Sequence, residues 1–560
     1  MYQALLENFL TNGKDLASCR QVQYPNQIDD CPQSQLAHVK QTAMNRLSSI
    51  RTALNLLLTV VILTCGCLVS VSARDFWVSP KGNARGTGEF KNPWDLQTAL
   101  NQSGQVMPGD TIWLREGIYR GMFTSNLNGT APSPIIVRNY AGERATIDRA
   151  GADATGQAAL TVNGCFVWFW GLEITNSYPD RSRTSPFTGT VKAWRGPGVY
   201  VQQGIGFKFI NMIIHDNNTG IYDKEDGTEI YGCLIYFNGN NTFGHGMYIG
   251  NQSGTKSVKD CLIFDNGGLG IQSYSANPTS QQKGIRIEGN AAFNNGAITL
   301  DDQNSTNILV GAEAGVPAER IIVTDNYIYD ATSIAANKSK GLRLGQTDQN
   351  NKDAVVKDNY IACRVPLSVL WWHALELRGN TIYTEGTSGV LQMPSGVNPS
   401  VYQWDNNVYI SGRPEGPVFT FSRNTGLNRR IWQQIGLDND SKVIQNALLR
   451  PAGVKVFVRP NTYEPGGGNI IVFNWDLKKF VSVDASSVGL NVGDTFEIRD
   501  AQNYFGPPLI RSTYDGQPIR LPMHLSQVAR PIGNVERIPA HTAPEFAALV
   551  IRRSDKPKTK

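Results

Sequence analysis

Residues 209–217 read FINMIIHDN, and the pattern of this stretch recurs seven more times along the chain. The later copies are IYGCLIYFN from residue 230, VKDCLIFDN from 258, IEGNAAFNN from 287, VTDNYIYDA from 323, VKDNYIACR from 356, LRGNTIYTE from 377 and WDNNVYI from 404. Each copy has an apolar strand, a two-residue corner and a second short strand. The corner residue is in turn Asn211, Cys233, Cys261, Asn290, Asn326, Asn359, Asn380 and Asn407.

The spacing of these copies indicates a solenoid. It varies from about 20 to 36 residues, as it does when stacked units differ only in their loops. A repeat this short cannot bury its apolar face alone, so it must stack on its neighbours. A third strand recurs after a glycine, at Gly198, Gly220, Gly246, Gly270, Gly341 and Gly389. With three strands a coil and no helices between them, the chain predicts an all-β parallel β-helix whose corner amides bond along the stack.

The bulk composition fits a folded protein larger than one simple core. The chain has 560 residues, 41% hydrophobic and 18% charged, which suits a solenoid with an extra domain. The formal charge of +5 favours an anionic partner only weakly. We expect no nucleic-acid partner, because lysine and arginine form no dense stripe.

The N-terminal part carries one apolar run of membrane length, at residues 54–71. Arg46 and Arg51 precede it, and the small residues 71–73 follow it as a cleavage site, so residues 44–73 are expected to be a signal peptide. Residues 1–43 are then a non-native extension or a cytosolic segment. We expect a secreted protein, extracellular or periplasmic. The alternative is an uncleaved anchor with the β-helix outside, the only membrane contact we foresee.

The remaining chain divides by pattern. The repeats predict a β-helix over residues 74–412. Residues 413–451 interrupt the repeat as a helical linker, in which NRRIWQQIG forms a helix that Gly436 ends. Alternating strands over residues 452–553 predict a small β-sandwich. Residues 554–560 are expected to be a disordered tail.

Four cysteines follow the signal peptide, too few for a disulfide scaffold. Cys233 and Cys261 occupy the same corner in consecutive coils. Stacked strands lie about 4.8 Å apart, within the Cα separation that a disulfide accepts. They form either a disulfide or a pair of buried small residues in place of asparagine.

The first coils resemble a known group. VSPKG from residue 78, LQTAL from 96, PGDTIWLREGIY from 108 and APSPIIVRNYAGERATID from 131 are similar to the N-terminal part of pectin-lyase-like right-handed β-helix proteins, including polysaccharide lyases of the chondroitinase B and alginate lyase type. The resemblance implies a right-handed β-helix. The segment from Pro93 to Leu100 predicts a helix that caps the open end of the solenoid.

In that group the substrate face is generally the strand that here follows the glycine. Strand alternation predicts that one row of side chains on this strand points outward, with another row two residues further on. We therefore expect substrate-binding residues at Tyr200, Tyr222, Tyr248, Gln272 and Tyr274. Aromatic rings with polar edges suit sugar rings. The alternative is a solvated face in which tyrosine serves only as a good strand former.

The segment YDKEDG from residue 222 is the densest charged cluster on this face. We expect Asp223, Glu225 and Asp226 to be candidate ligands for Ca²⁺, which prefers carboxylate oxygens. Lys224 or His245 is the candidate base, and Arg343 the candidate partner of a substrate carboxylate. The alternative is an exposed acidic turn with an incidental lysine.

These features predict an enzyme, most simply a polysaccharide lyase that acts by β-elimination on a uronate-containing, acidic polysaccharide. Two alternatives remain open: a glycoside hydrolase on the same scaffold, and a non-catalytic glycan-binding surface protein. We expect a monomer, with Ca²⁺ as the only cofactor to consider.

Overall fold

The computed structural model describes residues 73–102, 104–151, 156–181, 195–239, 244–276, 281–300, 305–313, 315–331, 340–384, 387–394, 396–411, 418–421, 425–427, 429–445 and 451–554. Residues 1–72, and with them nearly all of the predicted signal peptide, lie outside these ranges, as does nearly all of the predicted tail. Among the helices in these ranges, none is both long enough and apolar enough to cross a membrane.

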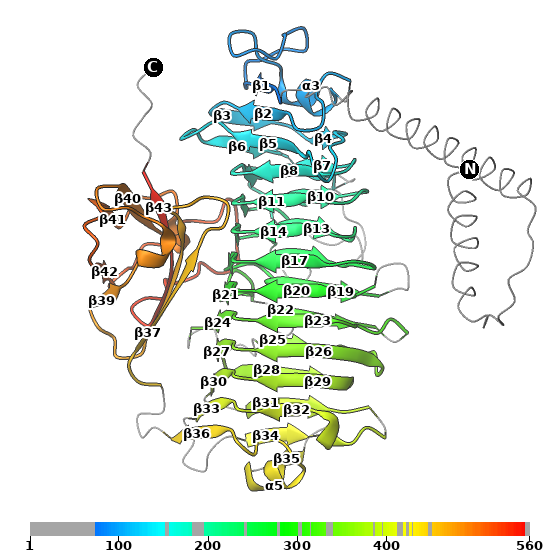
Figure 1. Ribbon diagram of the computed structural model, residues 1–560, viewed down its shortest axis with the longest axis vertical. Coiled ribbons are helices and arrows are strands. Elements are labelled where there is room, and N and C mark those ends of the chain that lie inside the picture. The colour runs from blue at the N-terminus through cyan, green and yellow to red at the C-terminus, as the bar shows by residue number, and fades with distance from the viewer. Residues whose placement is uncertain are drawn as a thin grey trace, which may run out of the picture. The chain divides into compact units, whose positions relative to one another are not determined.

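The described solenoid consists of three sheets of twelve strands each (Figure 1). Along the chain the strands enter the three sheets in turn, one strand per sheet in each coil. Sheet 1 precedes the asparagine corner, sheet 2 follows it, and sheet 3 contains the strands led by glycine. Neighbouring strands pair in parallel, except β34 with β35 at the C-terminal end of sheet 3.

The bounds of the strands are as follows. Sheet 1 comprises β1 (Asp75–Val78), β2 (Thr111–Leu114), β5 (Ile135–Asn139), β8 (Val167–Trp170), β11 (Lys208–Ile210), β14 (Glu229–Tyr231), β17 (Lys256–Lys259), β20 (Ile285–Glu288), β23 (Ile321–Thr324), β26 (Asn351–Lys357), β29 (Trp372–Arg378) and β32 (Gln403–Asp405). Sheet 2 comprises β3 (Gly117–Arg120), β6 (Ala145–Asp148), β9 (Glu173–Thr175), β12 (Ile213–His215), β15 (Leu234–Tyr236), β18 (Leu262–Phe264), β21 (Ala291–Phe293), β24 (Tyr327–Tyr329), β27 (Tyr360–Ala362), β30 (Thr381–Thr384), β33 (Val408–Ser411) and β36 (Lys442–Gln445). Sheet 3 comprises β4 (Phe123–Ser125), β7 (Leu160–Val162), β10 (Val199–Val201), β13 (Ile221–Asp223), β16 (Met247–Ile249), β19 (Ile271–Ser275), β22 (Thr306–Ala312), β25 (Lys340–Leu344), β28 (Val365–Leu370), β31 (Thr387–Gln392), β34 (Val418–Phe421) and β35 (Thr425–Leu427).

The corner asparagines hold the coils in register, as predicted. The side-chain amide of Asn290 donates to Oδ1 of Asn326 at 3.0 Å, and the same bond links Asn326 to Asn359, Asn359 to Asn380 and Asn380 to Asn407. The two cysteines extend this ladder as free thiols, because the backbone amide of Cys233 faces Sγ of Cys261 and that of Cys261 donates to Asn290. The structure therefore supports the second interpretation of this pair, in which two buried small residues replace asparagine.

A second asparagine ladder, which the sequence did not predict, runs where sheet 2 turns towards sheet 3. Its members are Asn217, Asn238, Asn266, Asn295 and Asn307, all buried and bonded one to the next. Steric crowding explains why glycine follows this ladder in the sequence. A Cβ on Gly220 would lie 2.4 Å from the carbonyl oxygen of Gly246 in the next coil, so no other residue fits there without backbone movement.

Both ends of the solenoid are closed. At the N-terminal end α3 (Leu96–Leu100) begins after Asp95, whose carboxylate caps Thr98, and it buries Leu96 and Leu100 against the first coil. At the other end the sheets continue past residue 412. There α5 (Arg429–Gln434) places the indole of Trp432 on the ring of Phe419 at 4.3 Å.

The C-terminal part is a five-stranded antiparallel sheet with a two-stranded sheet beside it. The larger sheet has the order β37 (Val454–Pro460), β38 (Gly468–Asn474), β43 (Phe546–Arg553), β40 (Thr495–Asp500) and β41 (Ile510–Thr513), and the smaller one pairs β39 (Phe480–Val483) with β42 (Ile519–Pro522). One face of the larger sheet forms a core with the smaller sheet. The other packs on the outer side chains of sheet 2, where Phe546 stacks on Tyr329 at 4.6 Å and the indole of Trp475 donates to the hydroxyl of Tyr360.

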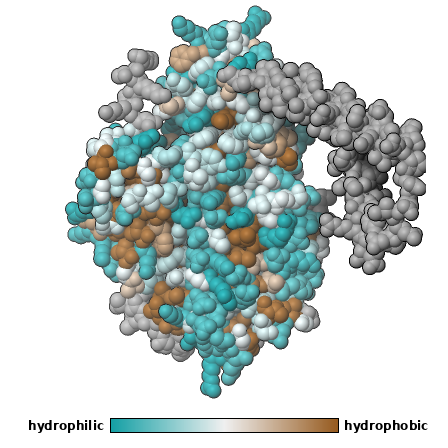
Figure 2. Space-filling model, in the orientation of Figure 1, coloured by the Kyte–Doolittle hydropathy of each residue, from teal (hydrophilic) through white to brown (hydrophobic). Residues whose placement is uncertain are grey.

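This packing limits where a substrate can bind. Among the described residues, the C-terminal sheet buries most outer side chains of sheet 2 between β15 and β30, whereas sheets 1 and 3 keep half-buried side chains along their outer faces. The face of the molecule in Figure 2 is mostly hydrophilic, with apolar residues in separate patches, so a ligand on it meets mainly polar groups.

Candidate functional site

Sheet 3 carries the predicted row of side chains in one register column. Tyr200 pairs with Tyr222, Tyr222 with Tyr248, and Tyr248 with Gln272 on successive strands. Their strand neighbours Val199, Ile221, Met247 and Ile271 are fully buried inside the solenoid. The column therefore points outward, as alternation requires. We call Tyr200, Tyr222 and Tyr248 the tyrosine column.

The three rings of this column meet edge to face. Ring centroids lie 5.4 Å apart between Tyr200 and Tyr222 and 5.2 Å apart between Tyr222 and Tyr248, at interplanar angles of 74° and 81°. Burial raises the pKa of the Tyr222 and Tyr248 phenols, so both keep their protons at neutral pH. The column thus offers aromatic surface together with hydroxyl donors.

Lys224 lies at the edge of this column. Its ammonium donates to the carbonyl oxygens of Ile249 and Tyr274, and Nζ lies 3.6 Å from the ring centroid of Tyr248. Burial and then the nearby charge of Lys256 lower the pKa of Lys224 to about 7, against the opposing effect of Asp223. At neutral pH a large fraction of this amine is therefore unprotonated, which a general base requires.

The prediction that Asp223 is a calcium ligand is wrong, because its carboxylate points into the solenoid. The alternation that turns Tyr222 outward turns Asp223 inward, and its carboxylate pairs with Nζ of Lys256 at 2.5 Å, both side chains being fully buried. Asp226 accepts bonds from the backbone amides of Gln252 and Ser253 and from the Ser253 hydroxyl.

The three predicted calcium ligands therefore do not converge. Glu225 contributes only its backbone amide to Asp223, and burial raises the pKa of its own carboxyl. In the part of the chain that the structure describes, no three His, Cys, Asp or Glu side chains are grouped so as to hold a metal ion. The acidic segment does not fit a calcium site as predicted, and we derive no step through one.

His245 lies next to the column but is a poor base. It is 6% exposed, its Nδ1 accepts a bond from the amide of Leu269, and its ring lies 6.0 Å from that of Tyr248. Burial and then the charge of Lys224 lower the pKa of His245 to about 3. The ring is therefore neutral and carries its proton on Nε2. Of the two candidate bases, Lys224 has the pKa closer to neutrality, and its amine lies against the ring of Tyr248.

Arg343 is in the same register as the column but far along it. Its strand β25 is the fourth after β13, so about 19 Å separates it from the strand that precedes Lys224. The Lys224 side chain crosses two of these strands, because its Nζ donates to the carbonyl oxygen of Tyr274 on β19, so about 10 Å of sheet lies between Nζ and β25. Burial lowers the pKa of Arg343. Its buried Nε has no hydrogen-bond partner, and neither does the buried Oε1 of Gln272.

The predicted Tyr274 is held by a residue that the sequence did not single out. Its hydroxyl donates to Glu313 at 2.6 Å, and its ring lies 6.4 Å from that of Tyr248. Lys256 was missed as well. Its contact with Asp223 joins residues 33 positions apart, and only the register of two sheets brings them together.

Comparison with known proteins supports the fold. Residues 76–307 match a family described as Pel9A-like, right handed beta helix region. Pectate lyase PEL9 of Emericella nidulans is 32% identical over 123 residues, which cover 19% of this chain and 29% of that protein. Pectate lyase L of Thermoclostridium stercorarium is 26% identical over 353 residues, covering 47% and 27%. The chain thus spans less than a third of the length of these relatives.

Two solved structures are also similar to this chain. The crystal structure of pectate lyase Pel9A is 21% identical, with a TM-score of 0.42 over 67% of this chain and 79% of that one. The lacto-N-biosidase of Eubacterium ramulus is 14% identical, with a TM-score of 0.38 over 67% and 68%. The family match over residues 76–307 confirms the resemblance to pectin-lyase-like right-handed β-helix proteins, and the three stacked sheets confirm the predicted fold class.

Proposed function

We propose that the protein is a polysaccharide lyase that cleaves a uronate-containing polysaccharide by β-elimination, with Lys224 as the base. One observation carries the proposal: an amine with a pKa of about 7 is fixed against an outward tyrosine column. The pectate lyase relatives support the choice of substrate class. In this proposal the β-helix acts outside the cytoplasm, as the apolar run at residues 54–71 predicts.

The chemistry uses groups that the column holds. The neutral amine of Lys224 takes the C5 proton of a uronate, the C–H electron pair becomes the C4–C5 double bond, and the C4–O bond breaks with its pair on the leaving oxygen. That oxygen takes the phenolic proton of Tyr222 or Tyr248, and the resulting phenolate recovers a proton from solvent. The phenols of Tyr222 and Tyr248 carry protons at neutral pH because burial raises their pKa. The amine returns its proton to solvent, which completes the cycle.

A second candidate function is glycan binding without cleavage. The hydrogen bonds of Lys224 favour it, because Nζ already donates to the carbonyl oxygens of Ile249 and Tyr274, whereas a base needs a free lone pair that reaches the sugar. On this alternative the tyrosine column only holds the polymer, and the unpaired polar atoms of Gln272 and Arg343 bind further sugars along the same face.

A substrate panel separates these functions. The purified protein is incubated with polygalacturonate, alginate and chondroitin sulfate, each with Ca²⁺ and with a chelator, and both near-ultraviolet absorbance and reducing ends are followed. We expect unsaturated product from a uronate polymer. Lys224→Met should lower its rate at least ~100-fold, as loss of a general base does, while the matched Lys283→Met, a partly exposed lysine paired with Glu319, should leave it unchanged.

Three outcomes would contradict the lyase. New reducing ends without unsaturation would indicate a hydrolase. Retention on a polysaccharide column without either signal would indicate binding alone. Unsaturated product at an undiminished rate from Lys224→Met would remove Lys224 as the base.

A further inference from the structure

The larger sheet of the C-terminal part carries charged side chains on the same face that packs on sheet 2. Strand alternation turns Phe546 and Val550 of β43 towards the solenoid, where both belong to the shared core, and it turns Arg552 the same way. The side chain of Arg552 is nevertheless 49% exposed. This end of the face therefore extends past the contact with the solenoid.

Three arginines meet one carboxylate there. Glu497 of β40 pairs in register with Arg552 on β43 and with Arg511 on β41, so the two arginines flank it from opposite strands. Oε1 of Glu497 accepts from Nε of Arg499 at 2.6 Å and from Nε of Arg552. Oε2 accepts from Arg499 at 3.2 Å and from Arg511 at 3.1 Å. These bonds fill the positions at which a carboxylate accepts. We call Arg499, Arg511 and Arg552 the arginine cluster.

The charge of the arginine cluster is not balanced. Although burial opposes the shift, the bonds and charges of these arginines lower the pKa of Glu497 to about 2, so its carboxylate is ionised at neutral pH. Three guanidinium charges therefore face one carboxylate. Glu464 also acts on Arg552, but its carboxylate accepts the indole N–H of Trp170 and lies 3.7 Å from Arg138. An excess of positive charge remains.

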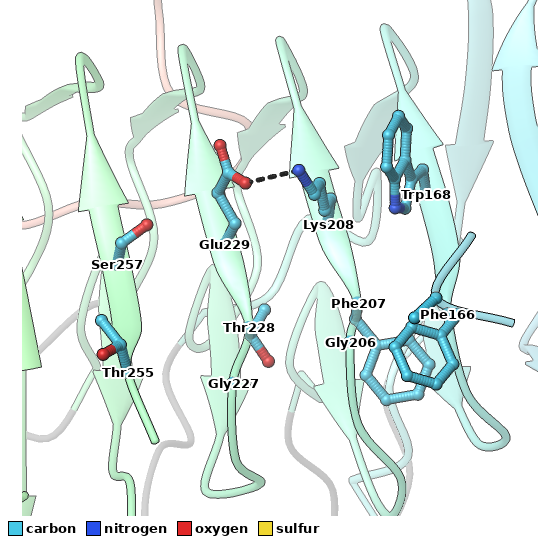
Figure 3. A pocket seen from close by; sticks show the side chains of 11 residues that line it. Phe166, Trp168, Gly206, Phe207, Lys208, Gly227, Thr228, Glu229, Thr255 and Ser257 are labelled. Atoms are coloured by element: carbon cyan, nitrogen blue, oxygen red, sulfur yellow. Dashed lines mark ion pairs between the residues drawn. The ribbon is translucent and has the colours of Figure 1, made fainter. Parts of the chain in front are cut away.

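The outer face of sheet 1 shows the ordinary, balanced arrangement. Lys208 and Glu229 lie 2.7 Å apart on neighbouring strands, and Figure 3 shows this pair among the outward side chains of β8, β11, β14 and β17. The hydroxyl of Tyr463 accepts from Lys208 and donates to Glu229. One charge compensates the other there, so the pair does not require a charged ligand. The arginine cluster differs, because its positive charges outnumber its single carboxylate.

Two members of the arginine cluster keep donors that the protein does not use. A guanidinium has five N–H donors. Among the described residues, the side chain of Arg511 makes one hydrogen bond, to Glu497, and it is 66% exposed. Arg552 uses Nε on Glu497, and its Nη1 reaches the hydroxyl of Tyr504 at 3.5 Å. Because both groups reach one carboxylate from opposite strands, they are close enough to share a second carboxylate on their outer side.

We propose that the arginine cluster binds the carboxylates of an acidic polysaccharide. Guanidinium and carboxylate groups match in a planar geometry with two N–H···O bonds. Charge complementarity favours such a chain over a neutral glycan. The choice of a uronate polymer rests on the proposed function, in which sheet 3 cleaves it. The arginine cluster takes no part in the elimination and holds the polymer on the other part of the molecule.

Binding without turnover tests this site. The full chain carrying Lys224→Met, which lacks the proposed base, is titrated by calorimetry with polygalacturonate, with its methyl-esterified and therefore uncharged form, and with dextran sulfate. We expect Arg511→Gln with Arg552→Gln to weaken the binding of polygalacturonate about tenfold at low salt, the size expected for two exposed ion pairs. The difference should shrink as salt rises. Binding of the esterified polymer should not change.

A matched control removes the same charge elsewhere. Arg85→Gln with Arg520→Gln changes two exposed arginines outside the cluster and should leave the affinity nearly unchanged. Arg511→Gln alone, on the edge strand β41, should give part of the loss without lowering the thermal midpoint, because Glu497 keeps its other two partners. The full loss should also appear in a Tyr248→Ala background, since the tyrosine column lies on sheet 3.

Three results would overturn the proposal. Unchanged affinity in the double variant would remove the site, and an equal loss in the control pair would reduce it to net charge. An equal loss with dextran sulfate would contradict the choice of carboxylate. The lyase proposal fails instead when the unsubstituted chain yields no unsaturated product, so the two failures are distinguishable.

Discussion

Two columns of aromatic rings run along the outside of this solenoid, and they differ in the geometry of their ring contacts and in their burial. On sheet 2 the rings of His215, Tyr236, Phe264 and Phe293 stack nearly parallel, with centroids 4.8–5.1 Å apart. All are buried, and the C-terminal sheet packs on the same face. On sheet 3 the tyrosines meet edge to face and stay half-buried. The same strand alternation produced both.

The difference teaches that an aromatic column on a β-helix is either a packing surface or a binding surface, according to what lies on it. On sheet 2 the polar groups among the rings have partners, such as the Tyr329 hydroxyl on Glu545 and the Tyr360 hydroxyl under Trp475. Along sheet 3, Gln272 and Arg343 keep buried polar atoms without partners. Unpaired buried atoms also occur beside the covered strands, at Oδ1 of Asp265 and Nδ2 of Asn294, so the half-buried rings, and not the unpaired atoms, distinguish the open face.

The largest effect should come from the covered column. Phe546→Ala removes a fully buried ring that packs on Tyr329 and Phe293, which should cost about 3–5 kcal/mol. Chemical denaturation of the full chain measures this loss of unfolding free energy. The control Val492→Ala, at a 74% exposed position, should change the midpoint little. A small effect from Phe546→Ala would mean that the two parts do not depend on this contact.

The second effect concerns the pair beneath the open column. Lys256→Met leaves the Asp223 carboxylate buried without its partner, which should cost about 3–5 kcal/mol. Lys256→Met with Asp223→Asn should recover part of that loss, and Lys259→Met, at a partly exposed lysine, should cost below ~1 kcal/mol. Because Lys256 lowers the pKa of Lys224, its loss should also move the basic group seen in the activity profile to higher pH. An unchanged profile would contradict this coupling.

The sequence predicted most of the solenoid because its corner asparagines recur visibly. The sequence pattern placed the end of the repeat at residue 412, but β36 continues sheet 2 beyond it. The last coil escaped notice because its corner residue is Ser441 instead of asparagine, although the Ser441 hydroxyl still accepts the bond from the backbone amide of Asn407. The sequence predicted the outward tyrosines by alternation. It could not predict which column is covered, or that Lys256 reaches Asp223, since both depend on contacts between distant segments.

A third effect depends on pH and concerns the covered column alone. His215 lies between Glu173 and Asp216, and although burial opposes the shift, these carboxylates raise its pKa to about 9. A raised pKa contributes stability that is fully present below about pH 6.5 and is lost as pH rises towards 9. The stability difference between the wild type and His215→Gln should therefore shrink across that window. A constant difference would mean that the histidine is not charged in the folded state.

The smallest effect on stability should come from the open column. Tyr222→Ala removes two edge-to-face contacts of half-buried rings, worth about 1 kcal/mol each. Its effect on retention by a polysaccharide column should be larger, on the order of tenfold for each 1.4 kcal/mol of binding. A large loss of thermal stability with unchanged retention would reverse the comparison and make this column a packing surface.

The most direct test of the account is the pH dependence of unsaturated-product formation on the best uronate substrate. With Lys224 as the base, the rate should rise through an apparent pKa near 7, the value expected for this amine, and Lys224→Arg should abolish the rise together with the activity. A rate that rises through a clearly different pKa, or that persists in Lys224→Arg, would contradict the account.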